Sequence, residues 1–343
     1  DEYMVKELLF EGSNRYYDQA LCTGLNITDE DIDDLCKAMK EQAVKNAHNE
    51  EQKASIKDVG RQQLRSWGVL IEHEGKDYPS NAFAILTGNG GLHVATQCGV
   101  FKGTTKAVFV DRREYTGPLW EQIDEAFQFV LRNIHLGAKL EGIYRKDIYE
   151  LPPDSIRELI INAVMNCSFL QNSHIQVAIY DDRLEITSPG GLMPGVTLDK
   201  MKEGYSKIRN RALAHAFSYM NLIEAWGSGI PKLMEAMQEY GLREPEFRDM
   251  EIGFRINLYR NVEETRMGTD QGVQKVDQGV SKSDQGIQKV DQDTQKSDQG
   301  IQKVDQDIQK LTDDAVKISV YTEYKLTDKS KAVLALIKEQ PDI

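Results

Sequence analysis

The chain has 343 residues, of which 40% are hydrophobic and 28% are charged, and its formal net charge is −13. This length allows two or three domains with hydrophobic cores, whereas the acidic balance disfavours nonspecific binding of nucleic acid, which requires clustered Lys and Arg. No run approaches the roughly 18–20 apolar residues that cross a membrane, and the first residues lack a signal-peptide pattern, so we expect a cytoplasmic protein with no membrane partner.

The first part of the chain, residues 1–145, has a mixed pattern of helices and strands. Thr28 followed by two acidic residues is a typical helix start, because the helix dipole favours negative charge in the first turn. Apolar spacing and turn residues predict the elements that come next. These are a helix over 57–67, a hairpin over 68–79, a helix over 80–86, strands over 94–101 and 107–110, and a helix over 119–134.

Residues 99–106 superficially suggest a phosphate-binding P-loop, since they include Gly99, Gly103 and Lys106. The required order Gly-x-x-x-x-Gly-Lys-Ser/Thr is not met, and no acidic Walker B partner can be placed. A helicase motor needs both elements to hold Mg-ATP. The sequence therefore predicts that this stretch does not form a DNA-unwinding motor.

A helical pattern follows Pro152-Pro153, and it carries Glu158 and Asn162 four residues apart. Side chains at this spacing lie on one face of a helix. Glu is a suitable general base for an attacking water, and the Asn carbonyl oxygen is a suitable neutral ligand for Mg²⁺. The alternative is an ordinary amphipathic helix whose polar stripe holds these two residues while its apolar side chains face a core.

Two glycine-rich segments come later in the chain. Ser188-Pro189-Gly190-Gly191 follows an alternating strand, and Gly227-Ser228-Gly229-Ile230 precedes a helical pattern. Glycine lets the backbone come close to a bound nucleotide. Taken alone, the first segment could be an ordinary turn and the second a flexible helix entry.

The order of these elements resembles the GHKL group of ATPases. It is closer still to a family labelled RecG-like C-terminal or divergent AAA-4, which follows a Schlafen-type AlbA-like domain in bacterial transcriptional regulators. The resemblance is strong over about 150–260 and weak over 1–150. The residues that carry it are Pro152-Pro153, Arg157-Glu158, Asn162-Ala163, Ser188-Pro189-Gly190-Gly191-Leu192, Arg209-Asn210, Glu224 and Gly227-Ser228-Gly229-Ile230.

The resemblance implies an α+β protein in which a mixed α/β linking region precedes a GHKL (Bergerat-type) α/β sandwich and a heptad-repeat tail. We expect the linking region at 1–145, after an absent AlbA-like domain, and the ATP-binding-like domain at 146–262. The tail then covers 263–313. Residues 314–343 would begin a truncated winged helix-turn-helix, because the apolar spacing of 331–338 is typical of its first helix. Any DNA partner would be bound through a local patch or through parts missing from this chain.

The resemblance also implies a site for ATP and Mg²⁺. Glu158 would be the catalytic base and Asn162 the metal ligand. Arg209-Asn210 and the segment between the glycine turns would form a lid. The residues implied to contact the nucleotide are Asn162, Asn166, Ser188, Gly190, Gly191, Arg209, Asn210, Gly227 and Gly229.

Two departures from the family pattern affect the predicted activity. The family usually has His-Arg-Asp-Tyr where this chain has Asn166-Cys167-Ser168-Phe169, so a charged cluster has become neutral. In GHKL enzymes an Asp accepts from the adenine amino group, and the nearest equivalent here is Ser188, a weaker acceptor. We therefore expect at most a weak Mg-dependent ATPase. The alternative is a non-catalytic GHKL-shaped scaffold that mediates dimerisation or partner binding.

A seven-residue repeat occupies 270–311 and alternates apolar spacings of three and four, as in a left-handed coiled coil. Glycines recur in four of the repeats, and each costs about 1 kcal/mol inside a helix. We expect this tail to be helical only if chains associate, which would make the protein a homo-oligomer. A plain spacer is an equal alternative.

Overall fold

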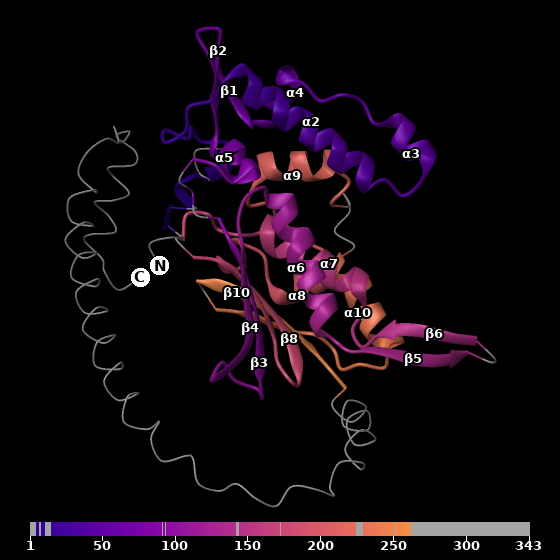
Figure 1. Ribbon diagram of the computed structural model, residues 1–343. Coiled ribbons are helices and arrows are strands. Elements are labelled where there is room, and N and C mark those ends of the chain that lie inside the picture. Colours follow the sequence, from indigo (N-terminus) through magenta and orange to yellow (C-terminus); the bar gives the residue numbers. More distant parts are fainter. Residues whose placement is uncertain are drawn as a thin grey trace, which may run out of the picture. The chain divides into compact units, whose positions relative to one another are not determined.

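The computed structural model describes residues 5–6, 8–10, 15–90, 92, 94–141, 144–171, 173–223, 229–250 and 252–261 (Figure 1). The chain divides into two units, 1–273 and 274–343, and all described residues belong to the first. The heptad repeat, its predicted coiled coil and the predicted start of a winged helix therefore lie outside the described residues. Within the described part, no helix is both long and apolar enough to span a membrane.

The described helices are η1 (Tyr17–Gln19), α2 (Asp29–Lys45), α3 (Glu50–Ser55), α4 (Arg61–Trp67), α5 (Asn81–Thr87), α6 (Leu119–Asn133), α7 (Pro153–Met165), α8 (Leu198–Lys202), α9 (Arg211–Tyr219) and α10 (Gly229–Glu239). The described strands are β1 (Leu70–His73), β2 (Lys76–Pro79), β3 (Thr96–Lys102), β4 (Val108–Tyr115), β5 (Leu136–Glu141), β6 (Tyr144–Tyr149), β7 (Ile175–Ile179), β8 (Arg183–Pro189), β9 (Glu246–Asp249) and β10 (Gly253–Tyr259). The expected mixed α/β architecture is confirmed at this level.

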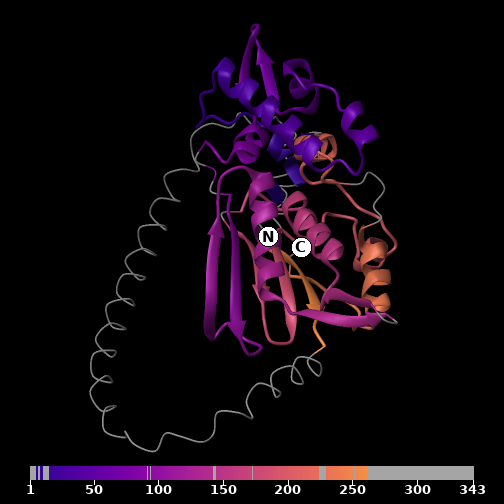
Figure 2. The same cartoon turned by 45° about the vertical axis from the view of Figure 1, so that its right-hand side comes forward.

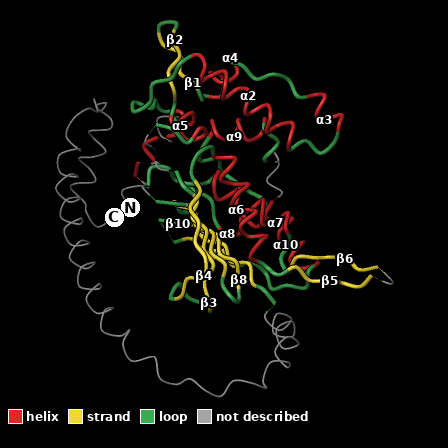
Figure 3. The backbone as a smooth tube through the Cα atoms, viewed as in Figure 1, coloured by secondary structure: helices red, strands yellow, loops and turns green. Residues whose placement is uncertain are grey.

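A mixed sheet of six strands, in the order β4-β3-β7-β8-β10-β9, is the centre of the fold (Figure 3). Only β3 and β7 pair in parallel among these strands, and the other neighbours are antiparallel. Parallel neighbours need a long crossover, which here contains α6. Helices α6 and α7 lie against one face of the sheet (Figure 2). Strands from both sides of the boundary expected near residue 145 thus share one sheet.

Local sequence signals explain several of the predicted helices. Thr28 and Asp31 form a capping box at the start of α2, with the Thr28 N–H donating to the Asp31 carboxylate at 2.7 Å. The helices expected over 80–86 and 119–134 are present as α5 and α6. The helix expected over 57–67 is shorter, because Gly60 has extended backbone and only Arg61–Trp67 is helical.

The hairpin expected over 68–79 is present, and the strands expected over 94–101 and 107–110 pair as a second hairpin. Strands β1 and β2 pair across a turn in which Glu74 and Gly75 both have positive φ, the conformation that tight hairpin turns require. Residues 99–106 lie in β3 and in the turn that joins it to β4. This hairpin is not the strand-to-helix loop of a P-loop, in agreement with the sequence analysis.

Helix α9 packs with the N-terminal elements, although it comes from the other half of the chain. It contacts η1, α2, α4 and α5, and Figure 1 shows α9 beside the indigo helices. Buried side chains from both halves, including Ile32, Leu64, Leu159 and Phe217, belong to one continuous hydrophobic cluster. The described residues of both halves therefore share one hydrophobic core.

Candidate functional site

Helix α7 presents Glu158 and Asn162 side by side, as their spacing predicts. The Asn162 Nδ2 donates to the Glu158 Oε1 at 3.3 Å, and both side chains are half-buried. Pro153 occupies the first turn, where its missing N–H costs nothing. The opposite face of α7 buries Ile156 and Ile160 in the core, so the polar pair is held on the remaining face.

The polar pair borders a cavity of about 260 Å³ between α7, the sheet and the segment before α9. Five of the predicted site residues meet there, from three separate stretches of the chain. They are Glu158, Asn162, Asn166, Ser188 and Gly229. The other lining residues are Ala163, Met165, Ile186, Met201, Gly204, Tyr205, Ser206, Lys207, Ile208, Ala214, Ile223, Ile230, Phe254 and Ile256.

Ser188 lies at the sheet side of this cavity. Although the sequence predicts a turn here, Ser188 is the sixth residue of strand β8 and pairs with Phe254 of β10. Its side chain is nearly buried, with 3% of the residue exposed. Ile186 and Ile256 line the same wall. Ser188 is thus a polar group in a largely apolar part of the cavity.

Gly229 brings the start of α10 against the Glu158 side chain. A Cβ at this position would overlap the Glu158 carboxylate, so the absence of a side chain permits the approach. The first turn of a helix presents free N–H groups and a positive dipole end, both of which favour anions. Gly227, the other predicted glycine of this segment, lies outside the described residues.

Gly190 and Gly191 form the turn after β8 and do not line the cavity. Gly190 has φ +89°, and a Cβ there would lie 2.7 Å from the Ser168 Cβ and 2.8 Å from the Arg209 Nη1. The Gly191 carbonyl accepts from the Arg209 Nη2 at 2.6 Å. These glycines allow Arg209 to come close to the backbone.

Arg209 and Asn210 differ from the expected lid. They are 8% and 1% exposed, and both hold backbone carbonyls. The Arg209 guanidinium donates to the Asn166 carbonyl, and the Asn210 Nδ2 donates to the carbonyls of Met165 and Cys167 at 2.9 and 2.8 Å. They therefore anchor the chain to the end of α7. The preceding stretch, which includes Met201 and residues 204–208, forms the cavity wall instead.

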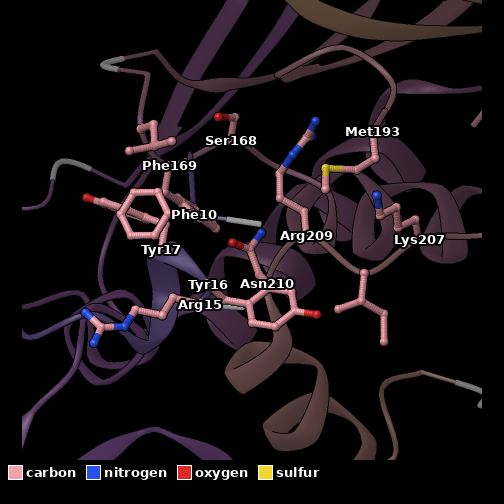
Figure 4. A pocket seen from close by; sticks show the side chains of 12 residues that line it. Phe10, Arg15, Tyr16, Tyr17, Ser168, Phe169, Met193, Lys207, Arg209 and Asn210 are labelled. Carbon is pink, nitrogen blue, oxygen red and sulfur yellow. The ribbon is translucent and has the colours of Figure 1, made fainter. Parts of the chain in front are cut away.

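A second, smaller cavity of about 60 Å³ adjoins the first and shares Lys207 and Ile208 with it. Figure 4 shows Arg209 and Asn210 among the residues that line this smaller cavity, together with aromatic side chains such as Phe169. The other wall of the smaller cavity comes from residues 15–17. This N-terminal contribution could not be predicted from the sequence, because no motif or spacing links residues so far apart.

The side chains at the cavity determine which protein ligands could hold Mg²⁺. Within the described ranges, no group of three or more His, Cys, Asp and Glu side chains could hold a metal ion. Glu158 and Asn162 offer two oxygen-bearing side chains at one point. Mg²⁺ completes most of its shell with phosphates and water, so the Asn162 oxygen fits as its protein ligand, with the Glu158 carboxylate beside it as the base.

Comparison with known proteins first defines the kind of fold. The crystal structure of the DIP2311 protein from Corynebacterium diphtheriae superposes with a TM-score of 0.57 at 20% identity. The match covers 76% of this chain and 50% of that chain, so this chain spans half the length of that protein. No match was found among curated protein sequences.

The family comparison is more specific. Residues 172–258 match the model of the family described as "Putative ATP-dependent DNA helicase recG C-terminal". The predicted resemblance is therefore confirmed over these residues. The matched stretch runs from just before β7 to the end of β10 and includes Ser188 and Gly229. It does not include α7, so the match says nothing about Glu158 and Asn162.

Proposed function

We propose that the larger cavity binds a nucleoside triphosphate, ATP in the first instance, together with Mg²⁺, in the manner of a GHKL-type domain. The observation that carries this proposal is the meeting of Glu158, Asn162, Ser188 and Gly229 around one cavity. These four residues come from three separate segments, because Glu158 and Asn162 share α7. The description of the matched family, which names an ATP-dependent protein, supports the same ligand.

Each residue has a chemical role in this proposal. Asn162 would bind Mg²⁺, whose charge would offset that of the phosphates. The start of α10 at Gly229 would face the phosphates, because N–H groups and the helix dipole favour anions there. Ser188 would meet the base among apolar neighbours. Glu158 would orient a water and accept its proton if hydrolysis takes place.

A calorimetric titration tests the proposal directly. ATP is added to the full chain with Mg²⁺ and, separately, with EDTA. We expect saturable binding that is much weaker without Mg²⁺. Absence of saturable binding at millimolar nucleotide would contradict the proposal. Inorganic phosphate release, measured on the same sample, then separates binding from a weak ATPase activity.

The alternative function is a GHKL-shaped scaffold that binds a partner and no nucleotide. One observation favours it: the end of α7 carries neutral Asn166, Cys167 and Ser168, of which Cys167 and Ser168 are buried. In either case we propose a regulatory role, with any DNA contact made outside the described residues. The same titration decides between a nucleotide-responsive regulator and a scaffold.

A further inference from the structure

The C-terminal ends of α2 and α9 are joined by two reciprocal asparagine contacts. Asn46, the C-cap residue of α2, donates from Nδ2 to the carbonyl of Met220, the C-cap residue of α9, at 2.9 Å. Asn221 donates in return from Nδ2 to the carbonyl of Ala43, in the last turn of α2, at 3.2 Å. The last carbonyls of a helix have no partner within it, so each helix caps the other.

Two further side chains complete this junction. The Arg157 Nη2 donates to the Asn46 Oδ1 at 3.3 Å, and the Gln52 Nε2 donates to the Asn221 Oδ1 at 3.2 Å. Both amide groups therefore act as donor and acceptor at once. Arg157 belongs to α7 and directly precedes Glu158. The junction thus joins the helix of the predicted general base to the end of α9.

The chain that leaves this junction runs directly to the cavity. Asn221 has φ +53°, a left-handed conformation that Asn adopts more readily than most residues, so it sets the direction of the chain after α9. Ile223 follows two residues later and lines the cavity. Gly229, the next described residue after 223, lies against Glu158.

We propose that Asn46, Asn221 and Arg157 are positioning residues for the nucleotide site. By tying the end of α9 to α2 and α7, they hold residues 220–223, and with them Ile223 in the cavity wall, at a fixed place relative to the helix that carries Glu158. Helix α2 then affects the site indirectly, through the junction, since none of its residues is among those that line the cavity. The expected effect on nucleotide affinity rests on the proposed function, whereas the positional effect does not.

The test compares two variants that damage opposite ends of α2. Asn46→Ala removes the two junction contacts made by the Asn46 side chain, whereas Thr28→Ala removes the capping box at the far end. We expect Asn46→Ala to weaken Mg-ATP binding about fivefold to a hundredfold, the range of typical coupling between sites. Thr28→Ala should leave the affinity for Mg-ATP unchanged, even where it lowers the Tm as much as Asn46→Ala does. Equal affinities for the two variants would overturn the inference.

Asn221→Gly provides an independent arm, because glycine keeps the left-handed backbone accessible while removing the amide. Its effect on affinity should be less than additive with that of Asn46→Ala, since both changes open one junction. If the effects of the two substitutions on binding free energy are strictly additive, the two residues act independently, and this result would contradict a shared positioning role.

Hydrogen–deuterium exchange without nucleotide separates this inference from the proposed function. Peptides that contain residues 220–223 should exchange faster in Asn46→Ala than in Thr28→Ala. If the wild-type chain binds no ATP but this difference is present, the proposed function fails and the positional role is supported. If exchange is the same in both variants, the positioning role is wrong, whatever the chain binds.

Discussion

A carboxylate oxygen of Asp18 accepts a hydrogen bond from the backbone N–H of Leu213 at 3.0 Å, although 195 positions separate the two residues. Asp18 is 0% exposed and belongs to η1, whereas Leu213 lies in the first turn of α9. The contact joins the N-terminal segment to the helix that follows the Arg209-Asn210 anchor. Its strength should depend on the charge of Asp18.

The first prediction concerns that charge. Burial raises the pKa of Asp18 from 3.8 to about 6, although hydrogen bonds from the backbone of α9 oppose the shift. The folded state binds the Asp18 proton more tightly than the unfolded chain does, so protonation of Asp18 stabilises the fold. This contribution to the free energy of unfolding is fully present below pH 3.8 and is lost as the pH rises through about 6. The loss amounts to about 3 kcal/mol at neutral pH.

Asp18→Asn should remove this dependence, since an amide stays neutral and its oxygen still accepts from Leu213. We expect the variant to exceed the wild type in free energy of unfolding at pH 8 and to equal it near pH 4, as measured by urea denaturation. Asp34→Asn, at an exposed position of α2, is the control. A constant difference between Asp18→Asn and wild type across this pH range would contradict the prediction.

The second prediction concerns Asn162 and Glu158. Asn162→Ala should abolish the Mg²⁺-dependent part of ATP affinity, because it removes the neutral metal ligand of α7. Glu158→Ala should preserve binding and slow any turnover, since a general base contributes about 10²–10⁴-fold to rate and little to ground-state affinity. Calorimetry and phosphate release measure the two quantities. Loss of binding in Glu158→Ala alone would reverse these role assignments.

The third prediction concerns base selectivity at Ser188. A hydroxyl is a weaker acceptor for the adenine amino group than a carboxylate, so the wild type should discriminate poorly between ATP and GTP. Ser188→Asp should raise the preference for ATP, and Ser188→Asn is the matched uncharged control. The two dissociation constants are measured by competition. A wild-type preference for ATP of about a hundredfold or more would show that Ser188 does not meet the base.

The fourth prediction separates backbone strain from packing at the turn after β8. Gly190 and Gly195 both have positive φ, but only a Cβ at Gly190 would meet other atoms within 4 Å. Strain of this kind costs about 1–3 kcal/mol per residue. Gly190→Ala should therefore lower the free energy of unfolding more than Gly195→Ala. Equal losses would show that Ser168 and Arg209 move aside without cost.

Local signals in the sequence were sufficient for much of the fold. The capping pattern at Thr28 and the apolar spacing of 119–133 lie within one helix each, so they could be interpreted without knowledge of the rest of the chain. The neighbouring positions of Glu158 and Asn162 follow from helix geometry alone. By contrast, the pairing of β3 with β7 depends on residues more than seventy positions apart, and strand composition does not specify a partner.

The roles of Arg209 and Asn210 show the corresponding limit for the site. Their place in a motif predicted that they contact the nucleotide, but they line the smaller cavity and not the larger one. The motif could not indicate that their side chains hold the carbonyls of Asn166, Met165 and Cys167. Those carbonyls become available only where α7 ends, which depends on tertiary packing.

The parallel pairing of β3 with β7 constrains how this protein can be divided for expression. A fragment beginning at residue 146 would retain the stretch matched by the family model but lose β3 and β4. Strand β7 would then become an edge with unpaired N–H and C=O groups along Ile175–Ile179. Exposed edges of this kind promote association between chains. Shorter versions meant to remain monomeric should therefore start before Thr96.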